Sequence, residues 1–190
     1  MYLETIYNAC NEQWGHDEES DSVVSDYFLC VSSIDPRKNF PILLSAFKEL
    51  PEVNLKIVGG MNAVFNKLEL EVPKNAEFLG RVSDDELASL YRNAKAFIYP
   101  SLYEGFGLPP IEAAHFGCPV VLSDIPVLKE VCRDSAIYFN PYSPESIIEA
   151  VKKVNSFTDQ QRDEMIAKAK NNIKRFTWDT SAKKLLKLLS

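Results

Sequence analysis

Two carboxylates flank a glycine-rich turn in the middle of the chain, an arrangement suited to binding a phosphorylated sugar. Glu104 precedes Gly105 and Gly107, and Glu112 follows the prolines at 109–110. Proline suits the first turn of a helix, where a missing N–H costs nothing. Glycine lets the main chain approach a ligand closely, and a helix N-terminus attracts an anion. The pattern predicts a pocket with Glu104 at its mouth and Glu112 one helical turn further in.

A second loop carries two adjacent cations. Arg37 and Lys38 follow Pro36, which stiffens the turn, and they precede a predicted helix. Such a pair is suited to clamp a diphosphate. A charged turn is an ordinary surface feature by itself, but this one follows a strand, as the Glu104 turn does. Complementary groups gathered at strand ends are what a binding site needs.

These loops must be positioned by alternating strands and helices. Apolar runs without internal alternation predict strands buried on both faces, and therefore a doubly wound parallel sheet of the Rossmann-like α/β class. Ligands of such sheets bind at the carboxyl ends of the strands, where both loops lie. The predicted strands are 27–33, 54–59, 75–80, 95–99, 119–123 and 136–139. The predicted helices are 39–50, 63–70, 84–93 behind a capping box at Ser83, 109–117, 127–132 and one that starts at 143–145.

Composition fits one globular unit without a metal. The chain has 190 residues, 46% of them apolar and 25% charged, which is enough for a single α/β core. No apolar run is long enough to cross a bilayer and no signal-peptide pattern begins the chain, so we expect a cytoplasmic location. The four cysteines form no Cys-x-x-Cys pair and the two histidines are isolated. We therefore expect no metal ion and no cofactor.

Charge is unevenly distributed along the chain. The net charge is −6, yet residues 150–190 hold ten Lys or Arg and four Asp or Glu. This basic segment is compatible with peripheral contact with anionic lipid at the inner face of a membrane, or with solvated helix faces, which the dispersed charges favour. No basic patch interleaved with aromatic residues indicates nucleic-acid binding.

The segment around the two glutamates resembles, nearly letter for letter, the signature of the family 4 retaining glycosyltransferases. Residues 104–109 read Glu-Gly-Phe-Gly-Leu-Pro, and Glu112 precedes an alanine. Gly-Cys-Pro-Val-Val follows at 117–121, and Ser-Asp at 123–124. The family has the two-domain GT-B fold. The resemblance implies that Glu104 faces the donor sugar and that Glu112 holds the ribose of the nucleotide.

Other positions take implied roles from the same resemblance. Arg37 and Lys38 match a basic pair that neutralises the diphosphate leaving group, so with Glu104 they are the candidate catalytic residues. Serines stand at 32 and 33, where the family often has glycine. The remaining implied donor-binding residues are Gly105, Phe106, Gly107, Leu108, Arg81 and Val82, the last two next to the nucleobase. Gly59 follows the second predicted strand, where it either contacts the donor or only forms the turn that ends the strand.

The resemblance also predicts a domain organisation. It runs from about Tyr27 to the C-terminus, where 176–186 resemble the helix that crosses back to the acceptor domain in GT-B enzymes. We interpret 23–190 as a nucleotide-sugar (donor) binding domain that includes this crossover helix. We interpret 1–22 as an interdomain linker or a remnant of the acceptor domain. The chain is then the C-terminal half of a GT-B glycosyltransferase, and we expect it to be inactive without an acceptor domain.

The implied activity is hexosyl transfer with retention, from a nucleoside-diphosphate sugar to a hydroxyl of a glycan or lipid-linked sugar, as in polysaccharide biosynthesis. One alternative is a non-catalytic nucleotide-sugar binding module that needs a separate acceptor-binding partner. Another is a different α/β protein. A dinucleotide enzyme is disfavoured because no Gly-x-Gly-x-x-Gly follows the first strand, and a receiver domain because no acidic cluster ends that strand.

Overall fold

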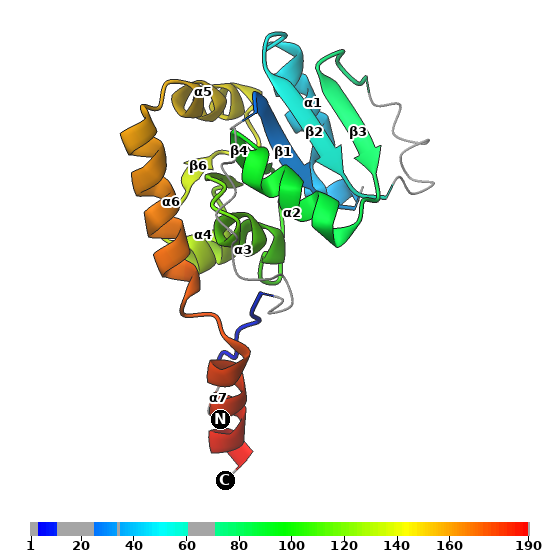
Figure 1. The fold of residues 1–190 in the computed structure, drawn as a ribbon. Coiled ribbons are helices and arrows are strands. Elements are labelled where there is room, and N and C mark those ends of the chain that lie inside the picture. The colour runs from blue at the N-terminus through cyan, green and yellow to red at the C-terminus, as the bar shows by residue number, and fades with distance from the viewer. Residues whose placement is uncertain (1–3, 11–24, 34, 61–70, 190) are drawn as a thin grey trace.

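A computed structural model describes residues 4–10, 25–33, 35–60 and 71–189 (Figure 1). Within these residues, six parallel strands form one sheet in the order β3-β2-β1-β4-β5-β6. This order confirms the predicted doubly wound sheet, and its direction reverses between β1 and β4. The strands are β1 Tyr27–Val31, β2 Asn54–Val58, β3 Ala76–Gly80, β4 Ala96–Tyr99, β5 Val120–Ser123 and β6 Ile137–Phe139.

The described helices are the 3₁₀ turn η1 Pro36–Lys38, α1 Phe40–Lys48, α2 Asp84–Asn93, α3 Leu108–His115, α4 Pro126–Cys132, α5 Pro144–Asn155, α6 Asp159–Ile173 and α7 Trp178–Leu189. Helices α1 to α5 start close to the predicted positions, whereas η1 and α6 were not predicted as helices. The predicted helix 63–70 lies outside the described residues. The first strand is shorter than predicted, because Ser32 and Ser33 already belong to the loop.

Helices cover both faces of the sheet and create two cores. Phe28 and Cys30 of β1 point into the core that α1 and α5 close. Leu29, between them, points into the core that α2, α3 and α4 close. Successive strand residues point to opposite faces, so a strand buried on both sides must be apolar throughout. This explains the continuous apolar runs of the sequence.

Local caps fix where the helices around the sheet begin. Ser83 Oγ accepts a hydrogen bond from Glu86 N at 3.2 Å, as the predicted capping box requires of the serine. A complete capping box lies at the start of α6, where Thr158 and Gln161 bond reciprocally. The Arg162 guanidinium then donates to the Lys95 and Ala94 carbonyls, which ties α6 to the start of β4.

Helix α7 projects away from the sheet and its covering helices, and residues 4–10 lie beside it (Figure 1). Ser181 Oγ donates to the Tyr7 carbonyl at 2.6 Å, and Lys184 Nζ to the Thr5 carbonyl at 3.4 Å. A set of large apolar side chains on this helix remains exposed, namely Trp178, Leu185, Leu186, Leu188 and Leu189. None of the helices described here combines the length and apolarity needed to cross a membrane.

Candidate functional site

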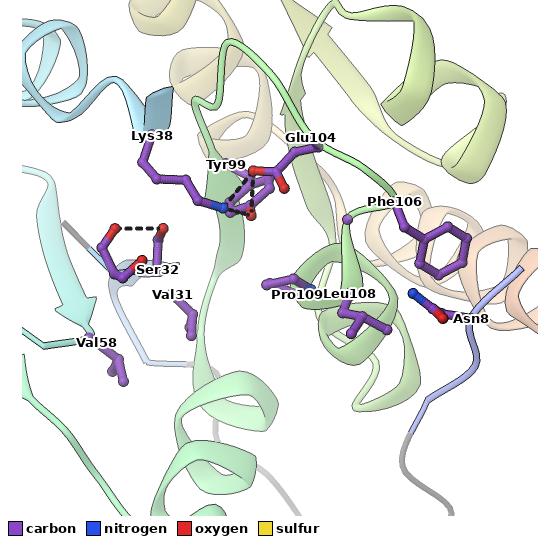
Figure 2. Close-up of a pocket in the computed structure, with 13 residues that line it drawn as sticks. Asn8, Val31, Ser32, Lys38, Val58, Tyr99, Glu104, Phe106, Leu108 and Pro109 are labelled. Carbon is purple, nitrogen blue, oxygen red and sulfur yellow. Dashed lines mark hydrogen bonds and ion pairs between the residues drawn. The ribbon is translucent and has the colours of Figure 1, made fainter. Parts of the chain in front are cut away.

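A pocket of about 430 Å³ opens at the carboxyl ends of β1, β2 and β4, where the strand order reverses. Open α/β sheets bind their ligands at this place. The loops after these strands, the start of α3 and one residue of the N-terminal segment form its walls (Figure 2). The lining residues are Asn8, Val31, Ser32, Ser33, Lys38, Val58, Gly59, Tyr99, Glu104, Phe106, Gly107, Leu108 and Pro109.

Lys38 and Glu104 form a close ion pair in this pocket. Lys38 Nζ lies 2.5 Å from Glu104 Oε1, and their side chains are 8% and 9% exposed. Arg37 Nη1 lies 3.4 Å from the other carboxylate oxygen, Oε2, and its side chain is 45% exposed. The three residues predicted as catalytic are therefore in contact, although 66 residues separate Lys38 from Glu104.

The protonation state of Glu104 follows from these contacts. Burial opposes its ionisation, but hydrogen bonds from Lys38, Ser101 and Tyr99 and the charge of Lys38 outweigh it, so the pKa of Glu104 is lowered from its ordinary value. The carboxylate is ionised at neutral pH. The pocket thus holds a largely buried carboxylate and the Lys38 ammonium before any ligand enters, and Arg37 contacts Glu104 from outside the pocket lining.

The two loops that carry the charges are joined through the backbone. Leu102 N donates to the Arg37 carbonyl at 2.8 Å, and Arg37 N donates to Asp35 Oδ1 at 3.0 Å. Asn39 caps α1 in the left-handed conformation, with φ of 58°. These contacts turn the chain sharply after η1 and direct Lys38 toward β4, so both loops form one unit.

Glu112 lies in α3 outside the lining of the pocket. Its Oε2 accepts a hydrogen bond from the hydroxyl of the buried Tyr91 at 3.1 Å. Burial raises the pKa of Glu112 above its ordinary value, and the nearby Asp84 adds to this while the Tyr91 hydrogen bond opposes it. The two glutamates of the motif therefore stand in opposite electrostatic environments, since only Glu104 is paired with cations.

The raised pKa predicts that Glu112→Gln stabilises the protein near neutral pH. A carboxyl whose pKa is higher in the folded than in the unfolded state favours folding when it is protonated. That contribution is complete below the unfolded value and is lost as pH rises through the folded value. The stability gain of Glu112→Gln in urea unfolding should therefore be largest near pH 7 and shrink as pH falls toward about 4.

The exposed Glu149 of α5 offers the control, since Glu149→Gln should leave stability unchanged at both pH values. A Glu112→Gln variant that is less stable than the wild type at pH 7 would contradict the prediction.

Two glycines of the predicted site are required by the fold itself. Gly59 has φ of 148°, and a Cβ there would lie 1.9 Å from the Ser32 carbonyl oxygen. Gly107 caps α3 with φ of 94°, and its Cβ would lie 2.8 Å from Leu128 Cδ2. Gly105 differs, because no atom lies within 4 Å of its added Cβ. Backbone conformation and packing therefore account for glycine at positions 59 and 107. They do not account for glycine at 105, where the space beside the main chain could accept a ligand.

The remaining predicted residues lie around the pocket at different depths. Phe106 lines it and packs against Phe176, with ring centroids 5.2 Å apart, and Leu108 lines it at the start of α3. Arg81 is exposed in the turn after β3, and Val82 packs against the core beneath α2. Neither of these two lines the pocket.

Several lining residues had no predicted role. Tyr99 is the most important, because its hydroxyl contacts both Lys38 Nζ and Glu104 Oε1. Asn8 reaches the pocket from the N-terminal segment, close to Phe106 (Figure 2). The only signal for Tyr99 was a polar group at the end of an otherwise apolar strand. In the part of the chain that the structure describes, no three His, Cys, Asp or Glu residues gather as metal ligands would.

Comparisons with known proteins identify the family of the chain. Residues 16–172 match the model of a family described as glycosyl transferases group 1. The chain is 35% identical over 183 residues to the O-antigen chain mannosyltransferase RfbU of Salmonella typhimurium, covering 93% of this chain and 50% of that protein. It is 37% identical over 172 residues to the serotype-specific mannosyltransferase WbdA of Escherichia coli, covering 85% and 21% respectively.

Solved structures share the fold. A glycosyltransferase from Rickettsia africae superimposes with a TM-score of 0.81 at 17% identity, over 96% of this chain and 55% of that one. A trehalose-6-phosphate synthase gives 0.80 at 14% identity, over 98% and 51%. At such identities the likeness concerns the fold alone. The chain spans half of RfbU and about a fifth of WbdA.

Proposed function

This chain belongs to the group 1 glycosyltransferases, and we propose that it binds a nucleoside-diphosphate sugar for retaining transfer of the sugar to a hydroxyl acceptor. The observation that carries the proposal is the ion pair of Lys38 with Glu104 in a pocket next to the N-terminus of α3, with Arg37 in contact with Glu104 beside the pocket lining. Cations and a helix N-terminus suit a diphosphate, and a carboxylate beside them suits a sugar.

In this proposal, the diphosphate lies between the Arg37–Lys38 pair and the first N–H groups of α3, behind Gly107. Breaking the bond between the sugar and the diphosphate places negative charge on the leaving phosphate, which the two cations and the helix N-terminus stabilise. Positive charge develops on the sugar ring at the same time, and the Glu104 carboxylate stabilises it. Arg37 and Lys38 supply the positive charge that a metal ion supplies elsewhere, so we propose that no metal is required.

We assign the nucleoside to the side of the pocket toward α2. Glu112 would accept hydrogen bonds from the ribose hydroxyls, and Tyr91 already fixes the orientation of its carboxylate. The main chain at Arg81 and Val82, after β3, would contact the base. These three residues stay predictions that depend on the family resemblance, and nucleotide binding by their variants would test them.

We propose mannose as the donor sugar and a polysaccharide intermediate as the acceptor. The support is that RfbU and WbdA, both more than a third identical to this chain, are named mannosyltransferases, one of the O antigen. Titration with GDP-mannose and with other nucleotide sugars would test the choice of donor. A non-catalytic binding module is the alternative, and it would bind the donor equally well without supporting transfer.

The acceptor requires a further binding surface, which we propose is a separate domain in the same or another polypeptide. The chain spans half of RfbU, and the exposed leucines of α7 offer an apolar face for such a domain. We expect little transfer by these 190 residues alone. The support for peripheral contact with anionic lipid on the cytoplasmic side, where lipid-linked acceptors would be met, is the excess of ten Lys or Arg over four Asp or Glu in residues 150–190. Lys183 of this segment is exposed but pairs with Asp179.

The test of donor binding is Lys38→Ala. Loss of a charged hydrogen-bond partner should weaken binding of a nucleoside diphosphate by about 1.5–3 kcal/mol, roughly 10- to 150-fold. Arg37→Ala should act in the same direction at the lower end of this range, because Arg37 is more exposed. Isothermal titration with a nucleoside diphosphate and with the corresponding nucleoside separates the phosphate contribution, since the nucleoside should be affected far less.

Lys48→Ala is the matched control, because Lys48 pairs with Glu71 on the exposed surface at the far end of α1. It should leave both affinities unchanged. Equal losses for nucleoside and nucleoside diphosphate in Lys38→Ala would show that Lys38 shapes the loop and does not hold phosphate.

A further inference from the structure

Tyr99 ends β4 beside the Lys38–Glu104 ion pair, and its surroundings hold it firmly. The residue is 1% exposed, and its ring stacks on Phe97 with centroids 5.6 Å apart. Ser123 Oγ donates to the Tyr99 carbonyl at 3.3 Å. The hydroxyl therefore has a fixed place at the pocket wall, which does not depend on the ligand.

The Tyr99 hydroxyl connects the two charges of the ion pair (Figure 2). It accepts a hydrogen bond from Lys38 Nζ at 2.5 Å and donates one to Glu104 Oε1 at 2.8 Å. Lys38 Nζ reaches the same carboxylate oxygen at 2.5 Å. Burial, together with the neighbouring Glu104 carboxylate, raises the pKa of Tyr99 far above its ordinary value. The hydroxyl thus keeps its proton and remains a donor to Glu104.

Binding of a diphosphate changes the partners of Lys38. The ammonium must turn from Glu104 toward phosphate oxygens, and Glu104 then loses its closest cation while its side chain is only 9% exposed. A buried carboxylate without partners is costly. Arg37 is 3.4 Å away and half exposed, so Glu104 retains the hydrogen bond from Tyr99 at 2.8 Å and the nearby Ser101 hydroxyl, which also lowers its pKa.

We propose that Tyr99 is a positioning residue, which keeps the Glu104 carboxylate oriented and ionised while Lys38 moves from Glu104 to the diphosphate of the donor. The inference rests on the proposed function and goes beyond it, because it assigns a role to a residue that acts through its neighbours. Tyr99 lowers the cost of separating the ion pair. A tyrosine that only fills the core would have no such effect.

The test is Tyr99→Phe in the full chain, which keeps the ring and removes the hydroxyl. With GDP and UDP as probes in isothermal titration, the nucleotide that the wild type binds should bind about tenfold more weakly near pH 8. The ratio of the wild-type affinity to the Tyr99→Phe affinity should stay constant between pH 8 and about 6, where Glu104 remains ionised. It should shrink only as pH falls toward about 4, because a protonated Glu104 no longer needs a donor. Protonation of the phosphate groups of the nucleotide changes its binding to the wild type and to Tyr99→Phe alike, and therefore cancels in the ratio of their affinities.

The charged and titratable groups that face Glu104 among the described residues are few enough to interpret this pH profile. They are Lys38 and Arg37 from η1 and Tyr99 from β4, and Asp35 pairs with Arg37 at 3.5 Å. A Glu104→Gln background gives a second readout. There the carboxamide carries no charge to stabilise, so adding Tyr99→Phe should change nucleotide affinity less than twofold.

Tyr138→Phe is the control for loss of a tyrosine hydroxyl, since Tyr138 donates to the Arg133 carbonyl at 2.7 Å, away from the pocket. It should leave affinity unchanged. Equal affinities of Tyr99→Phe and wild type across the pH range would overturn the inference, as would an equal loss with and without Glu104→Gln. A wild-type chain that binds neither nucleotide would overturn the proposed function, and the inference with it.

Discussion

Glu104→Gln should separate donor binding from sugar transfer. Glu104 forms ion pairs with both cations of the proposed diphosphate site, because its Oε1 lies 2.5 Å from Lys38 Nζ and its Oε2 lies 3.4 Å from Arg37 Nη1. Removing its charge leaves Lys38 and Arg37 free for phosphate, so affinity for a nucleoside diphosphate should be kept or improved, up to about tenfold. Transfer should nevertheless fall by about 10²–10³-fold, because the charge that stabilises the reacting sugar is lost.

Two measurements are needed, namely calorimetric affinity for the nucleoside diphosphate and the transfer rate with an acceptor-binding domain present. Glu149→Gln, an exposed substitution on α5, should change neither. Glu112→Gln should give the opposite pattern from Glu104→Gln, with weaker binding of both the nucleotide and the nucleotide sugar, since both contain ribose. If both glutamine variants lowered the two affinities alike, the separate roles of Glu104 and Glu112 would have to be withdrawn.

The sheet was predictable because its physical signal is local. Residues such as Phe28, Leu29 and Cys30 are fully buried on alternating faces, and only an apolar run satisfies both faces at once. Helix α6 had no prediction, and its composition explains why. Of its 15 residues only Ala169 is buried, so almost no apolar stripe marks it. The capping box of Thr158 and Gln161 was the one local signal for its start.

The sequence predicted which loops meet at the site, because the order of the strands determines that. Lys38 and Glu104 follow β1 and β4, which pair directly in the sheet, so the loops meet at one edge. The direction in which each side chain points depends on tertiary packing, which cannot be derived from the spacing of residues in the sequence. Glu112 shows this, since α3 is rotated so that its carboxylate meets Tyr91. Tyr99 was missed because its strand reads as apolar core, and its hydroxyl becomes informative only beside Lys38.

Gly59→Ala should destabilise the fold strongly, although Gly59 was predicted as a donor-binding residue. Its φ of 148° disfavours any side chain, and the new Cβ would lie 1.9 Å from the Ser32 carbonyl oxygen. Ser32 cannot retreat easily, because its N–H donates to the Val58 carbonyl at 2.9 Å and joins β1 to β2. Backbone strain and overpacking together should cost about 2–6 kcal/mol in urea unfolding, a large part of a domain's stability.

Gly105→Ala is the comparison that distinguishes a glycine of the fold from a glycine of the ligand site. An added methyl group there meets no atom within 4 Å, so stability should change by less than about 1 kcal/mol. If the main chain at Gly105 approaches the donor closely, the same methyl group should weaken nucleotide-sugar binding while leaving unfolding unaffected. An unstable Gly105→Ala variant would contradict the structure of this loop. A stable variant with unchanged affinity would mean that the donor does not approach Gly105, and its place in the site would be withdrawn.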